Sequence, residues 1–490
     1  MRDLLLVGFL FVAIYFAFKR PYIGTAAWVW IALTAPTNWA FGFSQSFRLN
    51  FTIVLVTALS YLVVTRNKVF RLNALGFWIL MFAIWTLVST ALNINSNPAR
   101  VWDYWGQFIK VLLLFFFITL TVTRRLHIDT MVWAIVLAIS AYAGMEAVKF
   151  ILSGGGHRIM GRAGIIADRN DLAVAINMCV PLVVYLLQTT RHKWLRLGLW
   201  GLLMLNILSV VGTYSRGGFI GLSILAVAFW LKSRYKLPLA ILAFLMLPLL
   251  YQAAPEEWKE RQSTVTTAAE EDSSFIGRLW AWKISTLIAL DHPLTGGGFG
   301  AVLNPQIWDR YAPLTPDFSP LATPPIPQSS GTKAAHNIYF QVLGDHGFVG
   351  LGIFLLCLLL ALLNNMKNAR LGKQHDVLWY RQLASAFTLS LIGYGVTGAN
   401  VSLAYFDLLY AVLGLIAVMT LQRQQLLPGH AVPGPRQRGW QAYPDQPAAA
   451  HRQKSRSRPA RGLDTQSHDP RPRHAGPPSA LRQRPPVRNG

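Results

Sequence analysis

Ionisable residues at the ends of long apolar runs are the first candidates for chemistry in this sequence. Arg216 stands in Gly-Thr-Tyr-Ser-Arg-Gly-Gly (residues 212–218), two residues after Tyr214. Its guanidinium is permanently charged, and the neighbouring glycines leave room for another group to approach. Charged groups at membrane depth are costly and often mark function. An Arg at the end of a span can also extend to the membrane interface, so both interpretations stay open.

A long polar segment contains the next candidates. Arg278 lies in Gly277-Arg278-Leu279-Trp280, within a stretch of amphipathic helical spacing. Residues 291–300 follow and read Asp-His-Pro-Leu-Thr-Gly-Gly-Gly-Phe-Gly. Successive glycine N–H groups can form a site for an anion. A glycine-rich stretch after a helix is more often a simple turn, and the sequence leaves both possibilities open.

His336 and Asn337 stand where this segment meets the next apolar run. An imidazole titrates in the range that a general base needs, although a single histidine here is more often a hydrogen-bonded surface residue. Further basic and amide groups are expected on the same side of the membrane: Lys110, His157, Arg158, Arg162, Arg169 and Asn170.

Motifs for several other chemistries are absent from the sequence. It contains no Asp-x-Asp, His-Glu-x-x-His, Gly-x-Ser-x-Gly or P-loop motif. We therefore expect no metal ion and no cofactor. A cationic set without facing carboxylates suits a substrate with a pyrophosphate group, because Arg binds phosphate oxygens through paired hydrogen bonds. Such groups also stabilise the charge of a departing pyrophosphate.

The elements that must position these residues are membrane helices. The chain has 490 residues, of which 53% are hydrophobic and 13% charged, whereas soluble domains have roughly 25% charged residues. This composition excludes an ordinary soluble enzyme, and the 17 Trp, 27 Phe and 16 Tyr exclude a disordered chain. Apolar runs of about 17–25 residues can each cross roughly 30 Å of hydrocarbon. We expect an all-α, polytopic membrane bundle of 12–13 transmembrane helices.

Thirteen candidate spans alternate with basic connections. Lys and Arg cluster in every second connection, for example Lys19-Arg20 and Arg124-Arg125, which assigns those connections and the tail to the cytoplasm. Arg-Pro follows the first run in place of a cleavage site, so we expect it to remain as a helix; otherwise the count is twelve. The spans are 4–18, 22–36, 51–65, 74–91, 108–123, 131–151, 171–189, 195–213, 217–231, 237–252, 338–363, 380–398 and 404–421.

Two regions differ from this pattern. The connection 253–337 is long, on the periplasmic side, with a predicted helix over 275–291 and a Pro-rich extended part over 311–328. The tail is basic and rich in Pro and Arg, so we expect it to be disordered. Because the positive charge lies in this tail and in the short loops, it indicates membrane lipids as partners and no nucleic acid. We expect three regions: an N-terminal transmembrane region (1–130), a second transmembrane domain that includes the 253–337 connection (131–425), and the basic tail (426–490).

The order of these motifs resembles that of the O-antigen ligase and O-antigen polymerase superfamily. The resemblance covers about residues 1–425 and rests first on Ser215-Arg216-Gly217-Gly218, on Arg278 followed by Pro293-Leu294-Thr295-Gly296, and on His336-Asn337 before Gly347. The N-terminal half is similar to a narrower group, the putative O-glycosylation ligases associated with exosortase A systems. Its motifs are Met1-Arg2-Asp3, Arg20-Pro21, Trp28-Val29-Trp30, Phe41-Gly42-Phe43, Trp102-Asp103-Tyr104-Trp105 with Lys110, and residues 161–170.

The resemblance implies a reaction and roles. Ligases of this kind transfer a glycan from undecaprenyl pyrophosphate to a protein, polysaccharide or lipid acceptor at the periplasmic face of the bacterial inner membrane, without nucleotide or metal. Arg216 and Arg278 would bind the pyrophosphate, and His336 would activate the acceptor. Substrate-binding groups would be Lys110, Arg162, Asn170, Tyr214 and Asn337. We expect Arg216, Arg278 and His336 to lie close together.

Two alternatives remain at this stage. A polymerase of the same superfamily would add one lipid-linked repeat to another, and sequence motifs hardly distinguish it from a ligase. A transporter of lipid-linked sugars would need charged residues near mid-span, interrupted helices and internal repeats. The sequence contains no convincing repeat, and Glu146 and Asp407 stand toward the ends of their spans.

Overall fold

A computed structural model describes most of the chain that precedes the tail. The described residues are 2–39, 42–66, 68, 71–161, 164, 166–238, 240, 241, 245, 273–318 and 322–423, of which 273 and 274 are described for the backbone alone. Their secondary structure consists of helices without a β-strand, as the all-α prediction requires. Arg162, most of the predicted span 237–252, residues 253–272 and the tail 426–490 lie outside the described residues.

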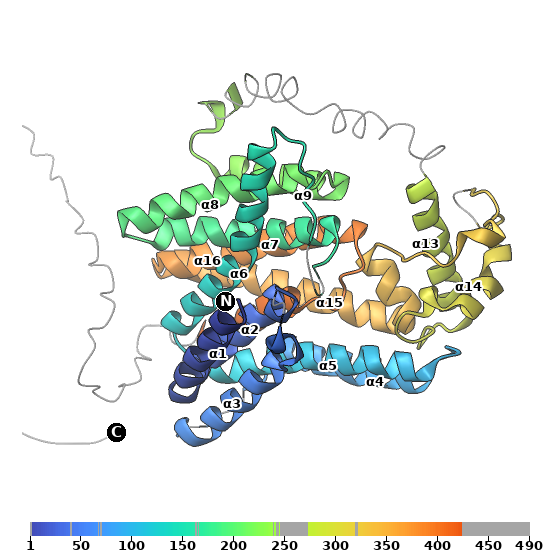
Figure 1. Cartoon of the computed structure of the whole chain (residues 1–490), viewed down its shortest axis with the longest axis horizontal. Coiled ribbons are helices and arrows are strands. Elements are labelled where there is room, and N and C mark those ends of the chain that lie inside the picture. The colour runs from blue at the N-terminus through green and yellow to red at the C-terminus, as the bar shows by residue number, and fades with distance from the viewer. Residues whose placement is uncertain are drawn as a thin grey trace, which may run out of the picture. The chain divides into compact units, whose positions relative to one another are not determined.

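The first three helices form one corner of the bundle. Helix α2 (Pro21–Thr34) packs against both α1 (Arg2–Lys19) and α3 (Leu49–Val64). The carboxylate of Asp3 accepts hydrogen bonds from the hydroxyl and the backbone N–H of Ser44 and so ties the start of α1 to the connection before α3. Figure 1 shows these helices in dark blue.

Six further helices follow along the chain. These are α4 (Ala74–Ala91), α5 (Pro98–Thr121), α6 (Arg125–Leu152), α7 (Arg169–Thr189), α8 (Lys193–Gly212) and α9 (Arg216–Lys232). Helix α7 is the most enclosed of the candidate membrane spans, because α6, α8, α9 and α16 (Leu378–Thr397) all pack against it. Its first turn therefore has a fixed position relative to those neighbours.

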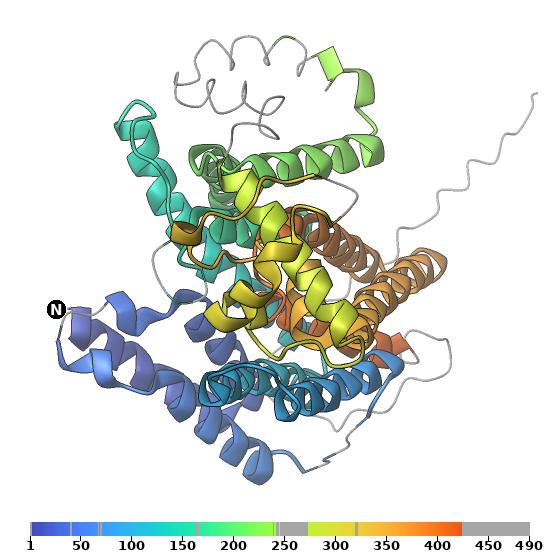
Figure 2. The same cartoon turned by 90° about the vertical axis from the view of Figure 1, so that its right-hand side faces the viewer.

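The 253–337 segment is a folded unit where it is described. It contains α13 (Ser273–Asp291), η3 (Ala301–Leu303), α14 (Pro305–Tyr311), η4 (Ala312–Leu314) and η5 (Gln328–Ser330). Trp280, Ile284, Ile288 and Trp308 belong to a hydrophobic core of its own. The predicted helix over 275–291 is confirmed by α13. Figures 1 and 2 show the yellow segment as a cap over one end of the helix bundle.

Helix α15 (Ile338–Gln374) differs from the predicted continuous span 338–363. Gly347 has φ 68° and ψ −168°, so the helix is broken near its start. A Cβ atom at Gly347 would lie 2.7 Å from the carbonyl oxygens of Pro293 and Leu294. An interrupted helix is also expected of a transporter, but here backbone atoms of the 253–337 segment pack directly into the break. The last elements are α16, η6 (Gly398–Asn400) and α17 (Asp407–Leu421).

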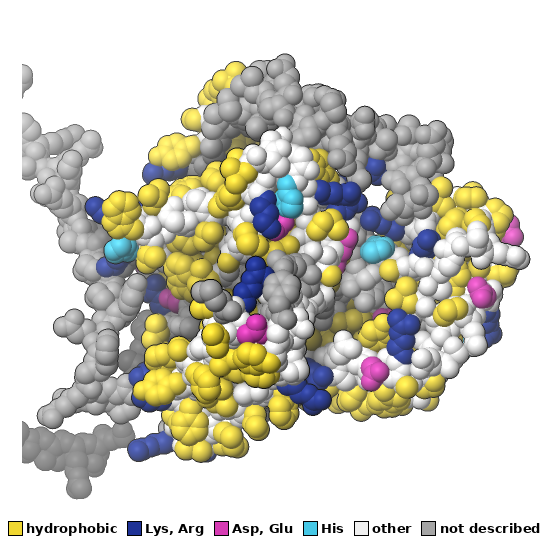
Figure 3. All heavy atoms as spheres, in the orientation of Figure 1, with side chains coloured by type: hydrophobic (Ala, Val, Ile, Leu, Met, Phe, Trp, Pro, Cys, Tyr) yellow, Lys and Arg dark blue, Asp and Glu magenta, His cyan; other side chains and the backbone are white. Residues whose placement is uncertain are grey.

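The described helices agree with a multi-pass membrane protein. Six of them are long and apolar enough to span a membrane: α4, α5, α6, α7, α8 and α15. Twelve of the thirteen predicted spans overlap a helix of the structure, and the few described residues of the remaining span, 237–252, are helical. Large hydrophobic side chains are exposed on α1 and α3, including Leu4, Phe11, Phe51 and Leu62. Hydrophobic side chains cover this part of the face in Figure 3, which suits contact with lipid.

Candidate functional site

Arg216 is the first residue of α9, and the residue before it holds that helix end in place. Ser215 is the N-cap: its Oγ accepts a hydrogen bond from the Gly218 N–H at 3.1 Å. The same hydroxyl donates to Oδ1 of Asn170 at 2.7 Å. The starts of α7 and α9 are therefore joined by side chains, and both helices direct the positive ends of their dipoles toward this junction.

Asn170 is itself fixed by the cap of α7. Asp168 is the N-cap residue, and its Oδ1 accepts hydrogen bonds from both the backbone N–H and the side-chain Nδ2 of Asn170, each at 2.7 Å. The amide of Asn170 thus lies between the Asp168 carboxylate and the Ser215 hydroxyl. This arrangement links the cap of α7 to the cap of α9, the residue before Arg216.

The glycines after Arg216 serve helix packing. A Cβ atom at Gly217 would lie 2.7 Å from Nδ2 of Asn400, and one at Gly218 would lie 2.6 Å from Cβ of Ala173. The group that approaches these glycines is therefore the protein itself. The approaching atoms belong to η6 and α7.

Asn400 also contacts the second predicted arginine. Nη1 of Arg278 donates a hydrogen bond to Oδ1 of Asn400 at 3.2 Å. One side chain in a short connection therefore touches both α9, beside Arg216, and α13, through Arg278. This contact brings the two arginines into one region although they belong to different parts of the fold.

His336 lies next to the same groups. Its backbone has φ 42°, a left-handed conformation that is costly for a residue with a Cβ atom. Its N–H donates to Oγ of Ser402 at 3.0 Å. Trp282, one turn after Arg278 on α13, donates from Nε1 to the carbonyl of Ala335 at 2.6 Å. Two hydrogen bonds thus fix the peptide group that joins Ala335 to His336.

The electrostatic surroundings of His336 favour its neutral form. Burial, and then the positive charge of Arg278, lower the pKa of His336 below its ordinary 6.5, while the negative charge of Asp168 acts in the opposite direction. At neutral pH the imidazole is therefore a proton acceptor. The same interactions identify Arg278 and Asp168 as the charged neighbours of this side chain.

The other predicted site residues are placed differently. Asn337 is the N-cap of α15, and its Oδ1 accepts from the N–H groups of Tyr339 and Phe340. The Tyr214 hydroxyl donates to the Gly155 carbonyl at 2.9 Å, and its backbone has φ 52°. Lys110 is exposed on α5, and no hydrogen bond of the described residues joins it to Arg278 or His336. The structure thus places Arg278 and Asp168 beside His336, joins Asn170 to the residue before Arg216, and gives Asn337 and Tyr214 structural contacts.

The glycine-rich stretch 291–300 is a turn whose N–H groups bind the protein itself. Gly297 and Gly298 donate to the carbonyls of Gly344 and Asp345, each at 2.9 Å. Gly300 donates to Oδ1 of Asp345 at 2.9 Å, and the Tyr405 hydroxyl donates to the other oxygen, Oδ2. The glycines of this turn thus bind α15 itself, Gly300 through the buried carboxyl group of Asp345, and the turn interpretation is correct.

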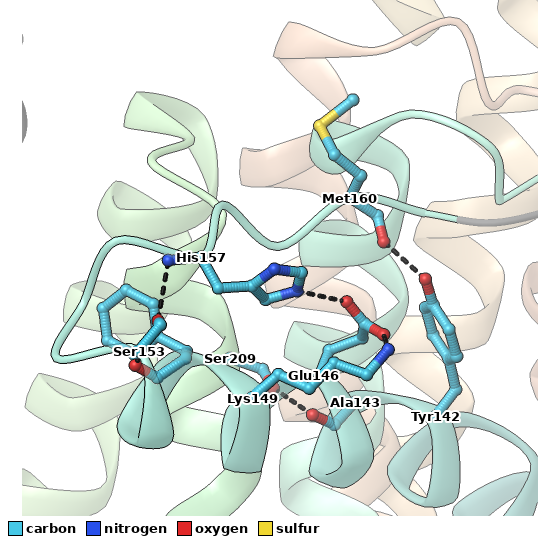
Figure 4. A network of polar contacts seen from close by, with 9 residues as sticks. Tyr142, Ala143, Glu146, Lys149, Ser153, His157, Met160 and Ser209 are labelled. Carbon is cyan, nitrogen blue, oxygen red and sulfur yellow. Dashed lines mark hydrogen bonds and ion pairs between the residues drawn. The ribbon is translucent and has the colours of Figure 1, made fainter.

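A second polar cluster, shown in Figure 4, lies where α6 ends. The carboxylate of Glu146 contacts Nζ of Lys149 at 2.6 Å and Nε2 of His157 at 2.8 Å. The backbone N–H of His157 donates to Oγ of Ser153 at 2.8 Å. These contacts hold the loop after α6 against the end of α6. Tyr214, which follows α8, holds the same loop through its hydrogen bond to the Gly155 carbonyl. His157, expected near the site, is thus paired with a carboxylate.

Sequence patterns alone did not indicate Asn400 and Ser402. Both belong to the short connection 399–403, which the topology assigns to the same side as the arginines. A single amide and a single hydroxyl in so short a connection form no motif, so only the contacts reveal them. Within the described residues, no three His, Cys, Asp or Glu side chains are grouped as metal ligands would be.

Two regions of the chain match known protein families. Residues 200–355 match the O-antigen ligase family. The match supports the predicted relationship of the chain with the O-antigen ligase superfamily. This ligase domain contains Arg216, Arg278 and His336, and it implies a lipid-linked glycan donor and an acceptor in a membrane context. Residues 1–191, which include Asp168 and Asn170, match a family of unknown function (DUF5935). No curated protein matches the chain.

The ligase domain assigns a broad activity to the molecule. It supports a glycosyltransferase-like enzyme of the ligase or polymerase type that handles glycans in a multi-pass membrane protein. Asn400 lies outside both matched ranges. The surroundings of Arg216, Arg278 and His336 therefore combine the ligase domain with groups from the regions before and after it.

Proposed function

We propose that the protein is a glycan ligase of a bacterial inner membrane, with its active site on the periplasmic side. It transfers an oligo- or polysaccharide from undecaprenyl pyrophosphate to an acceptor hydroxyl or amine. The observation that supports this most is His336, a neutral imidazole in a strained backbone conformation, beside Arg278. A proton acceptor next to permanent cations is what transfer from a pyrophosphate needs.

Arg216 and Arg278 bind the pyrophosphate in this proposal. Each guanidinium presents paired N–H donors to phosphate oxygens. Arg216 also stands at the N-terminus of α9, where backbone N–H groups and the helix dipole favour an anion. Positive charge at this position stabilises the leaving group most strongly as its bond to the sugar breaks.

His336 takes the acceptor's proton. The acceptor oxygen or nitrogen forms a bond to the anomeric carbon of the donor glycan, and the bond from that carbon to the pyrophosphate oxygen breaks. The electron pair of this bond leaves with undecaprenyl pyrophosphate, and the acceptor's proton moves to the imidazole. No oxidant or reductant is needed, and His336 returns its proton to solvent before the next cycle.

Asn400 and Asp168 act as positioning residues. Asn400 orients Arg278 through the 3.2 Å hydrogen bond and packs against Gly217 beside Arg216. Asp168 orients Asn170 and partly offsets the effect of Arg278 on the pKa of His336. The narrower relationship with exosortase-associated ligases is part of this proposal, with a protein, a secreted polysaccharide or a lipid core as the acceptor.

A transfer assay tests the proposal. Purified full-length protein receives radiolabelled undecaprenyl-pyrophosphate glycan together with membrane extract from the source organism. We expect label to move to a protein, polysaccharide or lipid-core fraction, and Arg216→Ala and His336→Ala to reduce this transfer by about 10²-fold or more. The matched controls are Arg310→Ala on α14 and His292→Ala after α13, which keep the wild-type rate.

Two other outcomes of this assay contradict the proposal. Label that stays lipid-linked while the glycan lengthens identifies a polymerase of the same superfamily. Transfer at the wild-type rate by a folded His336→Ala variant excludes His336 as the proton acceptor.

A further inference from the structure

An apolar groove lies among the helices of the N-terminal part. It has a volume of about 460 Å³ and is lined by side chains of α1, α2, the turn after α2, α6 and the start of α7, among them Phe9, Trp30, Trp39, Tyr142 and Leu172. This volume is within the range of roughly 300–1,000 Å³ that small-molecule sites occupy. Every lining residue falls inside residues 1–191, the range that matches a family of unknown function.

The polar side-chain groups of Trp39, Thr34 and Tyr142 already have partners. Nε1 of Trp39 donates to the Thr34 carbonyl at 3.0 Å, and the Thr34 hydroxyl donates to the Trp30 carbonyl at 2.7 Å. The Tyr142 hydroxyl donates to the Met160 carbonyl at 2.7 Å. These side chains therefore present apolar surface to the groove. A hydrocarbon chain meets that surface without leaving a buried donor or acceptor unsatisfied.

The groove and the candidate site share one segment of the chain. Ile166 and Leu172 line the groove, and Asp168 and Asn170 stand between them in the chain. Asn170 accepts the hydrogen bond from Ser215, whose neighbour is Arg216. Arg2 also lines the groove and adds positive charge to it. A lipid whose phosphates lie at Arg216 thus has apolar surface available within the same part of the fold.

We infer that this groove holds part of the polyprenyl chain of the lipid-linked donor, so that residues 1–191 supply the lipid site and residues 200–355 supply the transfer chemistry. This inference rests on the proposed function, because that function provides the polyprenyl pyrophosphate. It commits to this occupant in place of a phospholipid acyl chain, because the segment that lines the groove with Ile166 and Leu172 also carries Asn170, which contacts Ser215 beside Arg216.

Photolabelling of the full-length protein tests the inference. The probe is undecaprenyl pyrophosphate with a diazirine on its chain and no glycan, added to protein in nanodiscs of phosphatidylethanolamine and phosphatidylglycerol. We expect cross-links within residues 5–9, 30–39 and 137–142. Unmodified undecaprenyl pyrophosphate should compete for this label, and excess phosphatidylglycerol should not.

A matched pair of variants sharpens the test. Ala141 is exposed and lines the groove, whereas Val148 is exposed on the same helix, two turns further along, and does not line it. Ala141→Trp fills the groove and should weaken probe binding by about tenfold, equivalent to about 1.4 kcal/mol, while Val148→Trp leaves it unchanged. The labelling map of the wild-type protein needs no variant, so a folding defect in Ala141→Trp does not prevent the test.

Parallel transfer assays separate the two proposals. Wild-type protein that transfers glycan but is labelled outside the groove overturns the inference and leaves the proposed function intact. Groove label that phosphatidylglycerol removes also overturns it, because the occupant is then an acyl chain. Groove label without any glycan transfer overturns the proposed function and, with it, the assignment of the occupant as a donor lipid.

Discussion

Nη1 of Arg278 donates a hydrogen bond to Oδ1 of Asn400 at 3.2 Å, and the same asparagine packs against Gly217, the residue after Arg216. One amide thus contacts both Arg278 and the residue that follows Arg216. This relationship gives Asn400 a definite role in the account, because its side chain determines where the guanidinium of Arg278 points.

Asn400→Ala should therefore slow transfer while the protein remains folded. A hydrogen bond to a charged group contributes about 1.5–3 kcal/mol, so we expect kcat to fall by about tenfold to 10²-fold. Steady-state transfer rates of the purified variant measure the effect, with Asn304→Ala, a cap of α14, as the control. If Asn400→Ala is as active as wild type, Arg278 does not depend on this contact.

Gly217→Ala should destabilise the protein. The new Cβ atom would lie 2.7–2.8 Å from three atoms of Asn400, including its Cβ, so the whole residue must move. We expect a loss of about 1–3 kcal/mol, typical of overpacking. Thermal unfolding in detergent measures it, and Gly201→Ala on α8, with no heavy atom within 4 Å of its Cβ, should be neutral or stabilising. Equal melting temperatures for the two variants would contradict the packing at Gly217.

The pH dependence of transfer should follow the neutral form of His336. Because burial and Arg278 lower the pKa of His336, the rate should fall as the pH drops through a value below 6.5 and stay constant above it. Asp168→Asn removes the charge that raises this pKa, so the acidic limb should move to lower pH. Asn also caps helices well, so α7 keeps its start.

Arg278→Gln should shift the pKa of His336 in the opposite direction. It removes a charge that lowers the pKa of His336, so the acidic limb of the residual activity should move to higher pH. Rate profiles between pH 4 and pH 8 for the three proteins give the comparison. Limbs that coincide, or that move in the reverse order, would show that another group titrates.

Asp345→Ala should loosen the 253–337 segment from α15. The carboxylate accepts from Gly300 and from Tyr405, and both donors would be left buried without an acceptor, at a cost of about 1–3 kcal/mol each. Limited proteolysis should then cut the segment faster than in wild type. The exposed Asp309→Ala is the control, and identical proteolysis of both variants would contradict the role of Asp345.

Much of the fold could be predicted because it depends on local composition. Apolar runs of membrane-crossing length give helices wherever they occur, and the helix of 275–291 follows from its amphipathic spacing. The break in α15 was not predicted, because Gly347 stands in a run that looks continuous in sequence. Its conformation depends on the carbonyls of Pro293 and Leu294, which belong to a different part of the chain.

The candidate site could be predicted only in part for the same reason. Arg216, Arg278 and His336 are recognisable from residue type and position, because each is a polar group beside an apolar run. Sequence alone could not decide whether the glycine stretch binds an anion or forms a simple turn. The acceptor of the Gly300 N–H is Asp345, which lies 45 residues later in the chain. Asn400 forms no motif at all, and its importance follows from contacts with two distant helices.

Single-turnover transfer with His336→Ala is the most direct measurement of the central claim. Wild-type protein preloaded with labelled donor should release one undecaprenyl pyrophosphate for each glycan that reaches the acceptor. The account predicts that His336→Ala binds the donor with nearly unchanged affinity but transfers at a rate lower by about 10²–10⁴, while His292→Ala matches wild type. Transfer by a folded His336→Ala variant at the wild-type rate would contradict the account.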